Sequence, residues 1–151
     1  MSCLRAMFRR TTPLGLLMLL MLSQLSTPPM AAAPAPGWVY VSSAGPLQIV
    51  YVEPSRMSDP QLMAAVVAEV YRKIGGEHAF QIDFFDDRDG APVRPPYTLE
   101  QRRHHKAKFN FNPKNGLRRF VRLELVPDPD NAAKPRIRET EVELPLPWPP
   151  S

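Results

Sequence analysis

The chain has 151 residues, 44% of them hydrophobic, with 19 prolines against 7 glycines. This length allows one domain of ordinary size, and the composition excludes a collagen, a disulfide scaffold, a polytopic membrane protein and a wholly disordered chain. The formal net charge is +4, but three of the 19 basic residues and none of the 15 acidic ones precede residue 34, so the remainder carries 16 minus 15, or +1. Net charge therefore gives no argument for nucleic-acid binding.

The N-terminal region has the layout of a secretory signal peptide. Three arginines precede a largely apolar run at 14–22, and small residues follow it, ending in the alanines at 31–33. The run is shorter than the ~20 apolar residues of a membrane-spanning helix. We therefore predict a signal peptide over 1–33 and an exported protein, periplasmic or secreted. An uncleaved N-terminal membrane anchor is the alternative, because Pro34 and Pro36 follow the candidate cleavage positions.

The next segments predict a strand–helix–strand unit. The runs 38–41 and 47–52 are rich in β-branched and aromatic residues, and a five-residue turn segment between them indicates a hairpin. A helix is predicted over 60–74, because Asp59 and a proline form a helix start, apolar residues recur every three or four positions, and two glycines follow. The alternating run at 79–85 is a strand, which should pair in parallel with 47–52 through a right-handed crossover.

The C-terminal half predicts fewer regular elements. A capping box at 98–101 opens a short second helix whose only apolar contacts are Leu99 and Ala107. A strand follows at 117–126, and 136–144 alternates charge as an edge strand does. The fold class expected is therefore α+β: a small two-layer domain with one long amphipathic helix packed on a mixed sheet of three to five strands that includes the βαβ unit.

The domain organisation expected has three parts: the signal peptide at 1–33, the compact domain at 38–126, and a proline-rich tail at 127–151. The tail should be largely extended or disordered, because its proline spacing forbids helix and removes backbone donors. Trp148 is the residue that can dock the tail onto the domain, since a large aromatic side chain gains most from burial.

No catalytic or metal-binding pattern is present in the sequence. The histidines at 78, 104 and 105 lack the spacing of metal ligands, and the acidic turn at 86–90 lacks two of the four ligand positions of a calcium loop. No serine or cysteine stands in a recognisable nucleophile elbow, and there is no glycine-rich phosphate loop. We expect no cofactor and favour a protein that is not an enzyme. A small hydrolase using His104 or His105 as a base is the alternative.

One segment is unusually basic. Residues 102–122 carry eight positive charges and no acidic residue, with three phenylalanines among them. Phosphate contacts and base stacking use this mixture, so an anionic-polymer-binding module is a second alternative function. The same charges can instead pair with the acidic segment 77–89 inside the protein. The candidate anion-binding residues are Arg102, Arg103, Lys106, Lys108, Arg118, Arg119 and Arg122.

Two motifs carry a resemblance. The run Phe84-Phe85-Asp86-Asp87 follows a strand, and Asn110-Phe111-Asn112-Pro113-Lys114-Asn115-Gly116 is followed by Phe120. Over about 47–126 the chain resembles small bacterial exported proteins and lipoproteins of no assigned function. The resemblance implies a compact αβ domain outside the cytoplasm and implies no activity. We expect an exported binding or structural module whose partner is an envelope protein or an anionic polymer. It would contact a membrane only through an uncleaved N-terminal segment.

Overall fold

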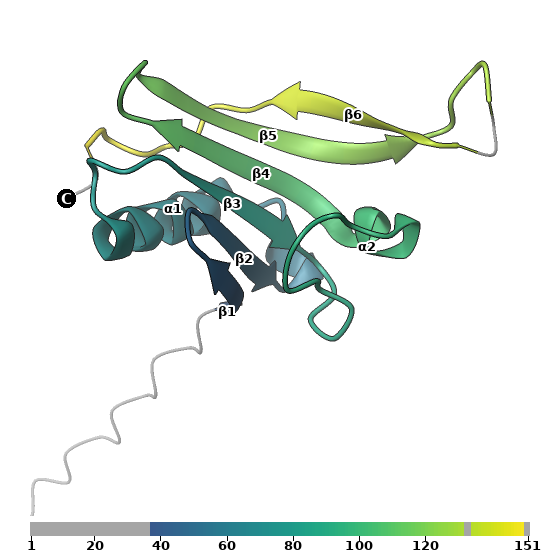
Figure 1. Cartoon of the computed structure of the whole chain (residues 1–151), viewed down its shortest axis with the longest axis horizontal. Coiled ribbons are helices and arrows are strands. Elements are labelled where there is room, and N and C mark those ends of the chain that lie inside the picture. The colour runs from purple at the N-terminus through teal and green to yellow at the C-terminus, as the bar shows by residue number, and fades with distance from the viewer. Residues whose placement is uncertain (1–36, 132–133, 150–151) are drawn as a thin grey trace, which may run out of the picture. The chain divides into compact units, whose positions relative to one another are not determined.

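The structure is a computed structural model that describes residues 37–131 and 134–149. Six strands form one sheet in the order of the sequence, and every neighbouring pair is antiparallel except β2 and β3, which are parallel (Figure 1). The strands are β1 (Trp38–Ala44), β2 (Leu47–Val52), β3 (Phe80–Phe85), β4 (His105–Asn112), β5 (Leu117–Val126) and β6 (Arg136–Glu141). The helices are a 3-10 turn, η1 (Pro54–Arg56), and two α-helices, α1 (Pro60–Ile74) and α2 (Leu99–His104).

Helix α1 connects the parallel strands β2 and β3, and its two ends match the sequence signals. The Asp59 carboxylate accepts hydrogen bonds from the backbone N–H groups of Gln61 and Leu62. These bonds, that of Leu62 above all, hold the pKa of Asp59 below its usual value. The helix ends at Gly75, whose φ of 90° is one that other residues rarely adopt. The predicted helix over 60–74 is confirmed.

The main core lies between α1 and one face of the sheet. Leu62, Met63, Val66, Val67 and Val70 are buried on the helix side. Alternate residues of the four central strands meet them, because successive side chains of a strand point to opposite faces. These sheet residues are Val50, Val52, Phe80, Ile82, Phe84, Ala107, Phe109, Phe111 and Phe120. Burial of this apolar surface is the main stabilising contribution of the fold.

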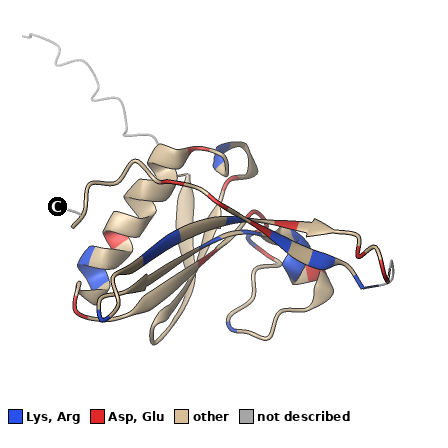
Figure 2. Ribbon diagram, turned by 90° about the horizontal axis from the view of Figure 1, so that it is seen from above, with Lys and Arg blue, Asp and Glu red and all other residues tan. Residues whose placement is uncertain are grey.

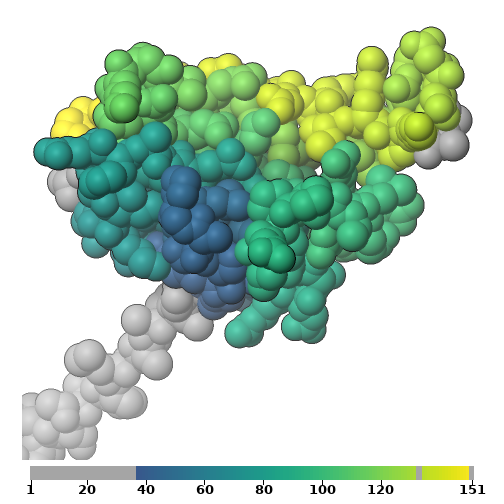
Figure 3. Space-filling view, in the orientation of Figure 1, coloured from purple at the N-terminus to yellow at the C-terminus, as the bar shows by residue number. Residues whose placement is uncertain are grey.

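The opposite face of the sheet is partly covered by residues 86–98, which connect β3 to α2 and which we call the covering loop. Its backbone is tied to β1, because the Ser42 hydroxyl donates to the Val93 carbonyl oxygen at 2.6 Å. Its Tyr97 ring packs edge-on against Phe85 of β3, with ring centroids 5.3 Å apart. Figure 3 shows the covering loop in teal-green lying beside the blue β1–β2 hairpin. The sheet is therefore covered on both faces near β3.

The expected fold class is wrong. The sheet has six strands, most of the regular structure is strand, and α1 is the one substantial helix of the described residues. The capping box at Thr98 forms and opens the expected short helix, which stops at His104 because from His105 onward alternate residues are buried with the period of a strand. Strand β6 has no apolar pattern, since all six of its residues are exposed, and it is held by pairing with β5.

The turn of the β1–β2 hairpin is shorter than expected. Strand β1 continues to Ala44 through a register shift between Tyr40 and Ser42, so the hairpin turn is the two residues after it instead of five. Gly45 in this turn has a φ of 61°, which favours glycine.

In the described ranges, no helix has the length and apolar character needed to cross a membrane. The expected signal peptide at 1–33 lies outside the described residues.

Candidate functional site

The seven candidate anion-binding residues do not converge on one surface. They lie on three elements: Arg102 and Arg103 on α2, Lys106 and Lys108 on β4, and Arg118, Arg119 and Arg122 on β5 (Figure 2). Neighbouring residues of a strand point to opposite faces, so Arg118 and Arg119 lie on different sides of the sheet. Arg122 is on the α1 side, where its guanidinium donates to the Ser58 carbonyl oxygen at 3.1 Å.

Four of these seven cations have acidic partners within the described residues. Arg119 lies 3.3 Å from Glu139 and 3.1 Å from Glu141, and Lys108 also donates to Glu139. The hydrogen bond from Lys108, with the Arg119 charge, lowers the pKa of Glu139, and the bond to Glu141 raises the pKa of Arg119. The other two pairs are Arg103 with Glu100 at 3.2 Å and Lys106 with Asp86 at 3.4 Å.

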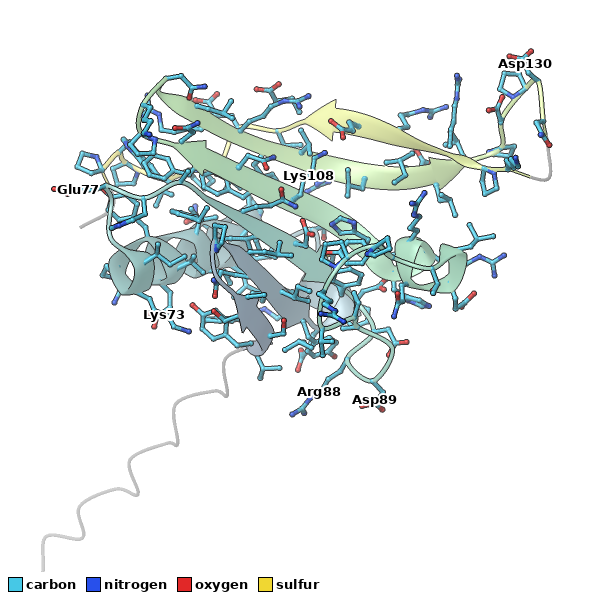
Figure 4. All side chains as sticks on the ribbon, viewed as in Figure 1. Lys73, Glu77, Arg88, Asp89, Lys108 and Asp130 are labelled. Carbon is cyan, nitrogen blue, oxygen red and sulfur yellow. The ribbon has the colours of Figure 1, made fainter. Side chains whose placement is uncertain are left out.

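Two of the four acidic partners come from β6, one from α2 and one from the segment 77–89. Figure 4 shows Asp89 at the tip of the covering loop, away from Lys108 on β4. Only Asp86 of that segment pairs with a candidate cation, Lys106. The charge alternation of β6 therefore has a structural use, since its glutamates neutralise the cations of the neighbouring strands across one sheet face.

The two adjacent histidines belong to different environments. His104 is partly exposed, and its Nδ1 lies 2.8 Å from Asp86 Oδ1 while its Nε2 lies 3.6 Å from Glu100 Oε1. A carboxylate that orients an imidazole is one half of a general-base arrangement. Within the described residues, however, neither imidazole is hydrogen-bonded to a serine, threonine or cysteine side chain. The same residues contain no group of three side chains that could hold a metal ion.

His105 belongs to a buried polar cluster, the Asp83 cluster, formed by Gln81, Asp83, Tyr97 and His105. Asp83 is 1% exposed and His105 is 8% exposed. Gln81 Nε2 donates to Asp83 Oδ1 at 2.8 Å, and the Tyr97 hydroxyl donates to Asp83 Oδ2 through a short hydrogen bond. His105 Nε2 lies 3.3 Å from Asp83 Oδ1 and has no well-aligned hydrogen-bond partner. The carboxylate is therefore surrounded by three polar side chains from two strands and the covering loop.

A register shift brings His105 onto the face that holds Asp83. Phe84 pairs with Ala107, whereas the next residue, Phe85, pairs with His105, so β4 has one extra residue at Lys106. This bulge places the His105 ring against Phe85, with centroids 4.8 Å apart and planes 10° apart. Bulges re-aim side chains in this way, and here the result is a histidine buried beside a carboxylate.

Asp83 stays ionised despite its burial. Burial by itself raises the pKa of this carboxyl, but the interactions with His105, Tyr97 and Gln81 outweigh burial and lower the pKa below its usual value. The pKa of Tyr97 is raised, first by burial and then by its hydrogen bond to Asp83. Because Tyr97 belongs to the covering loop, the Asp83 cluster fastens that loop to the sheet.

On the α1 side, the chain beyond β6 forms a strap. Residues 142–149, which we call the strap, have no helix or strand and pack on the main core. Their side chains alternate: Val142, Leu144, Leu146 and Trp148 are half-buried, while Glu143, Pro145, Pro147 and Pro149 are exposed. An extended segment produces this alternation because its successive side chains point in opposite directions.

Trp148 anchors the far end of the strap. Its ring centroid lies 4.9 Å from that of Tyr71 on α1 and 4.9 Å from that of Phe111 on β4. The Arg118 guanidinium lies 5.4 Å from the centroid of the same ring, within the range of a cation–π interaction. Arg118 is thus a candidate cation whose contact is aromatic instead of acidic.

A groove of about 480 Å³, which we call the strap groove, lies between the strap and β5. Its sheet side consists of Phe109, Arg118 and Phe120, and its other side is the segment from Glu141 to Leu146 together with Trp148. The volume falls within the range of ~300–1,000 Å³ of small-molecule sites. The lining joins apolar side chains to three charged ones, Arg118, Glu141 and Glu143, so its exposed surface is at least as polar as it is apolar.

The sequence contains a signal for this groove, in the segment that forms the strap. Apolar residues at 142, 144, 146 and 148 alternate with glutamate and prolines, which predicts an extended segment with one buried side. The Asp83 cluster has no such signal, since Tyr97 and His105 meet Asp83 only through a loop and a bulge.

No family model, curated protein or solved structure matches this chain.

Proposed function

We propose that this protein is a non-catalytic binding module that acts outside the cytoplasm and holds its ligand in the strap groove. The observation that carries the proposal is the groove itself: two phenylalanines form its floor, Trp148 its end, and Arg118 a cation on its wall. Aromatic rings supply apolar contact area at low entropic cost, and a single guanidinium supplies orientation. Glu141 and Glu143 also line the groove, so its chemistry suits a partly apolar ligand with one acceptor group near Arg118 and donor groups toward the glutamates.

The other candidate functions have less support in the geometry. Anionic-polymer binding needs several unpaired cations along one surface, whereas Lys108 and Arg119 face glutamates of β6. A hydrolase needs a nucleophile beside the His104–Asp86 pair, and within the described ranges neither histidine has a hydroxyl or thiol partner. A binding module requires neither feature, and the strap groove meets its main requirement.

The proposed location outside the cytoplasm is tested by determining where the exported protein begins. We expect the exported protein to begin between Ala32 and Pro36, because a positively charged flank, a short apolar run and small residues precede that point. N-terminal sequencing of protein recovered from the periplasm or the medium measures the start directly. A protein recovered only with the membrane and starting at Met1 or Ser2 would instead identify the uncleaved anchor.

The groove is tested with 8-anilinonaphthalene-1-sulfonate, a probe with two aromatic groups and one sulfonate. We expect saturable binding to the full chain at one site, measured by fluorescence titration. Arg118→Glu should weaken binding by about tenfold, because it replaces the attraction to the sulfonate with repulsion, and ~1.4 kcal/mol corresponds to tenfold. Arg102→Glu is the matched control, since it makes the same change of charge at an exposed position of α2.

Comparison of the two variants distinguishes binding of the probe in the strap groove from nonspecific adsorption to the protein surface. If Arg102→Glu weakens binding as much as Arg118→Glu, the probe senses net charge and the strap groove is not its site. If the folded full chain shows no saturable binding, the proposed function is wrong and a purely structural module remains.

A further inference from the structure

We infer that an opening in the sheet between β4 and β5, which we call the notch, binds a small aliphatic anion. Two adjoining hollows form the notch, of about 470 and 360 Å³, and both are lined by Lys106, Leu123 and Glu124. These volumes fall within the range of small-molecule sites, ~300–1,000 Å³. No described residue lines both the notch and the strap groove, so the notch is a second site and goes beyond the proposed function.

The notch is present because β5 continues beyond its pairing with β4. The last pair between these strands is Ala107 with Arg122, and from Leu123 to Val126 the described partner of β5 is β6 alone. Pairing with β4 ends at the bulge, where Lys106 is the extra residue. Figure 1 shows β5 and β6 continuing past the start of β4, near α2. The hollows therefore lie where the ladder between β4 and β5 is interrupted.

The lining of the notch combines hydrogen-bond donors with apolar side chains. Besides the three shared residues, the larger hollow is lined by Pro54, Met57, Ser58, Arg122 and Thr140, and the smaller by Arg103, His105 and Leu125. Guanidinium and ammonium groups make charge-assisted hydrogen bonds to oxyanions, and hydroxyl groups donate to them as well.

The lining also distinguishes the ligand of the notch from that of the strap groove. None of the described residues that line the notch is a phenylalanine, tyrosine or tryptophan, whereas Phe109, Phe120 and Trp148 line the strap groove. Stacking on aromatic rings favours an aromatic ligand in the strap groove. The ligand expected in the notch is an oxyanion, phosphate or carboxylate, on a short aliphatic body.

The notch has one positive charge more than its acidic partners neutralise. Arg122 has no acidic partner within 37–131 and 134–149, and its guanidinium donates there to the Ser58 carbonyl oxygen at 3.1 Å. A guanidinium has several N–H donors, so others of Arg122 are available to a ligand. The other charged lining residues are paired, Arg103 with Glu100, Lys106 with Asp86 and Glu124 with Arg138. One uncompensated charge attracts one anionic group, which favours a small ligand over a polymer.

The test titrates the full chain with n-butyl phosphate and with butyrate, measured by isothermal calorimetry. We expect saturable binding of at least one of these probes, and Arg122→Gln should weaken that binding at least about tenfold, because it removes a charge-assisted contact. Arg102→Gln is the matched control, since it removes the same charge from an exposed position of α2 that does not line the notch. Lys106→Gln takes the place of Arg122→Gln if that variant does not fold.

The outcomes separate this inference from the proposed function. Binding that Arg122→Gln weakens and Arg102→Gln does not supports the notch, and the probe that binds identifies the anionic group as phosphate or carboxylate. No saturable binding by the folded wild type, or an equal loss in both variants, overturns the inference. 8-Anilinonaphthalene-1-sulfonate should bind Arg122→Gln as it binds the wild type, because the strap groove is intact in this variant. A loss of its affinity in Arg122→Gln would contradict the assignment of two separate sites.

Discussion

Val66→Asp is expected to abolish folding, whereas Ala65→Asp should fold like the wild type. Val66 is fully buried against the sheet, and Ala65 is exposed on the opposite side of the same helix. An unpaired carboxylate in an apolar core costs several kcal/mol, which is comparable with the whole stability of ~5–15 kcal/mol of an ordinary domain. Circular dichroism and thermal melting of the two variants measure the difference.

The neighbouring position makes this a controlled experiment. Both variants add one aspartate to the middle of α1, so their effects on net charge are equal. Helix propensity falls by up to about 0.7 kcal/mol at Ala65 and hardly at Val66, so propensity alone would make the control the less stable variant. A larger loss at Val66 therefore reports the burial of its side chain. A Val66→Asp protein that melted cooperatively near the wild-type temperature would show that this face of α1 is not in the core.

Helix α1 could be predicted from the sequence because every local signal agrees there. The Asp59 cap, the apolar spacing and the glycine at 75 all specify one helix with one buried side, and the structure has it. When the local signals agree, the secondary structure of a segment can be predicted from its own sequence, without knowledge of its tertiary contacts. The parallel pairing of β2 and β3 across α1 follows from the same unit.

The rest of the sheet was predicted in part. The strand expected at 117–126 is β5 and the edge strand expected from 136 is β6, whereas β4 was not expected because its signals conflict with those of a helix. At 98–104 the capping box opens a real but short helix, and it ends where β4 begins at His105, because β4 pairs with β3 and β5. Strand β6 is polar on both faces, so its place is specified by glutamates that meet Lys108 and Arg119 on neighbouring strands. A sequence pattern reports the period of a segment and not its partners.

The candidate sites also differ in how far they could be predicted from the sequence. The basic residues at 102–122 were visible in the sequence, but only Lys106 pairs within the expected segment, with Asp86, whereas Lys108 and Arg119 pair with glutamates of β6. The strap groove left a readable alternation at 142–148. The Asp83 cluster left none, because it requires a loop to return Tyr97 to the sheet and a bulge to turn His105.

Asp83→Asn is expected to lower the free energy of unfolding by about 2–3 kcal/mol at pH 7, the contribution typical of hydrogen bonds to a charged group. The carboxylate accepts from Gln81 and Tyr97 and lies beside His105, and the neutral amide cannot replace its charge. Tyr97 would then hold the covering loop less firmly. Urea unfolding of the wild type and the variant measures the loss. Asp89→Asn is the matched control, because Asp89 is exposed at the tip of the same loop.

The same pair of proteins tests the ionisation of Asp83 through the pH dependence of stability. The folded-state pKa of Asp83 lies below its usual value of 3.8, so the unfolded state binds the proton more readily. Its charge therefore stabilises the fold fully above about pH 4 to 5, and this contribution is lost as the pH falls through the folded-state pKa. The wild-type advantage over Asp83→Asn should thus shrink as the pH falls below that range. Asp59 and Glu139 also titrate there, but they are common to both proteins and cancel in the difference. An advantage that stayed unchanged as the pH fell well below about 4 would contradict an ionised Asp83.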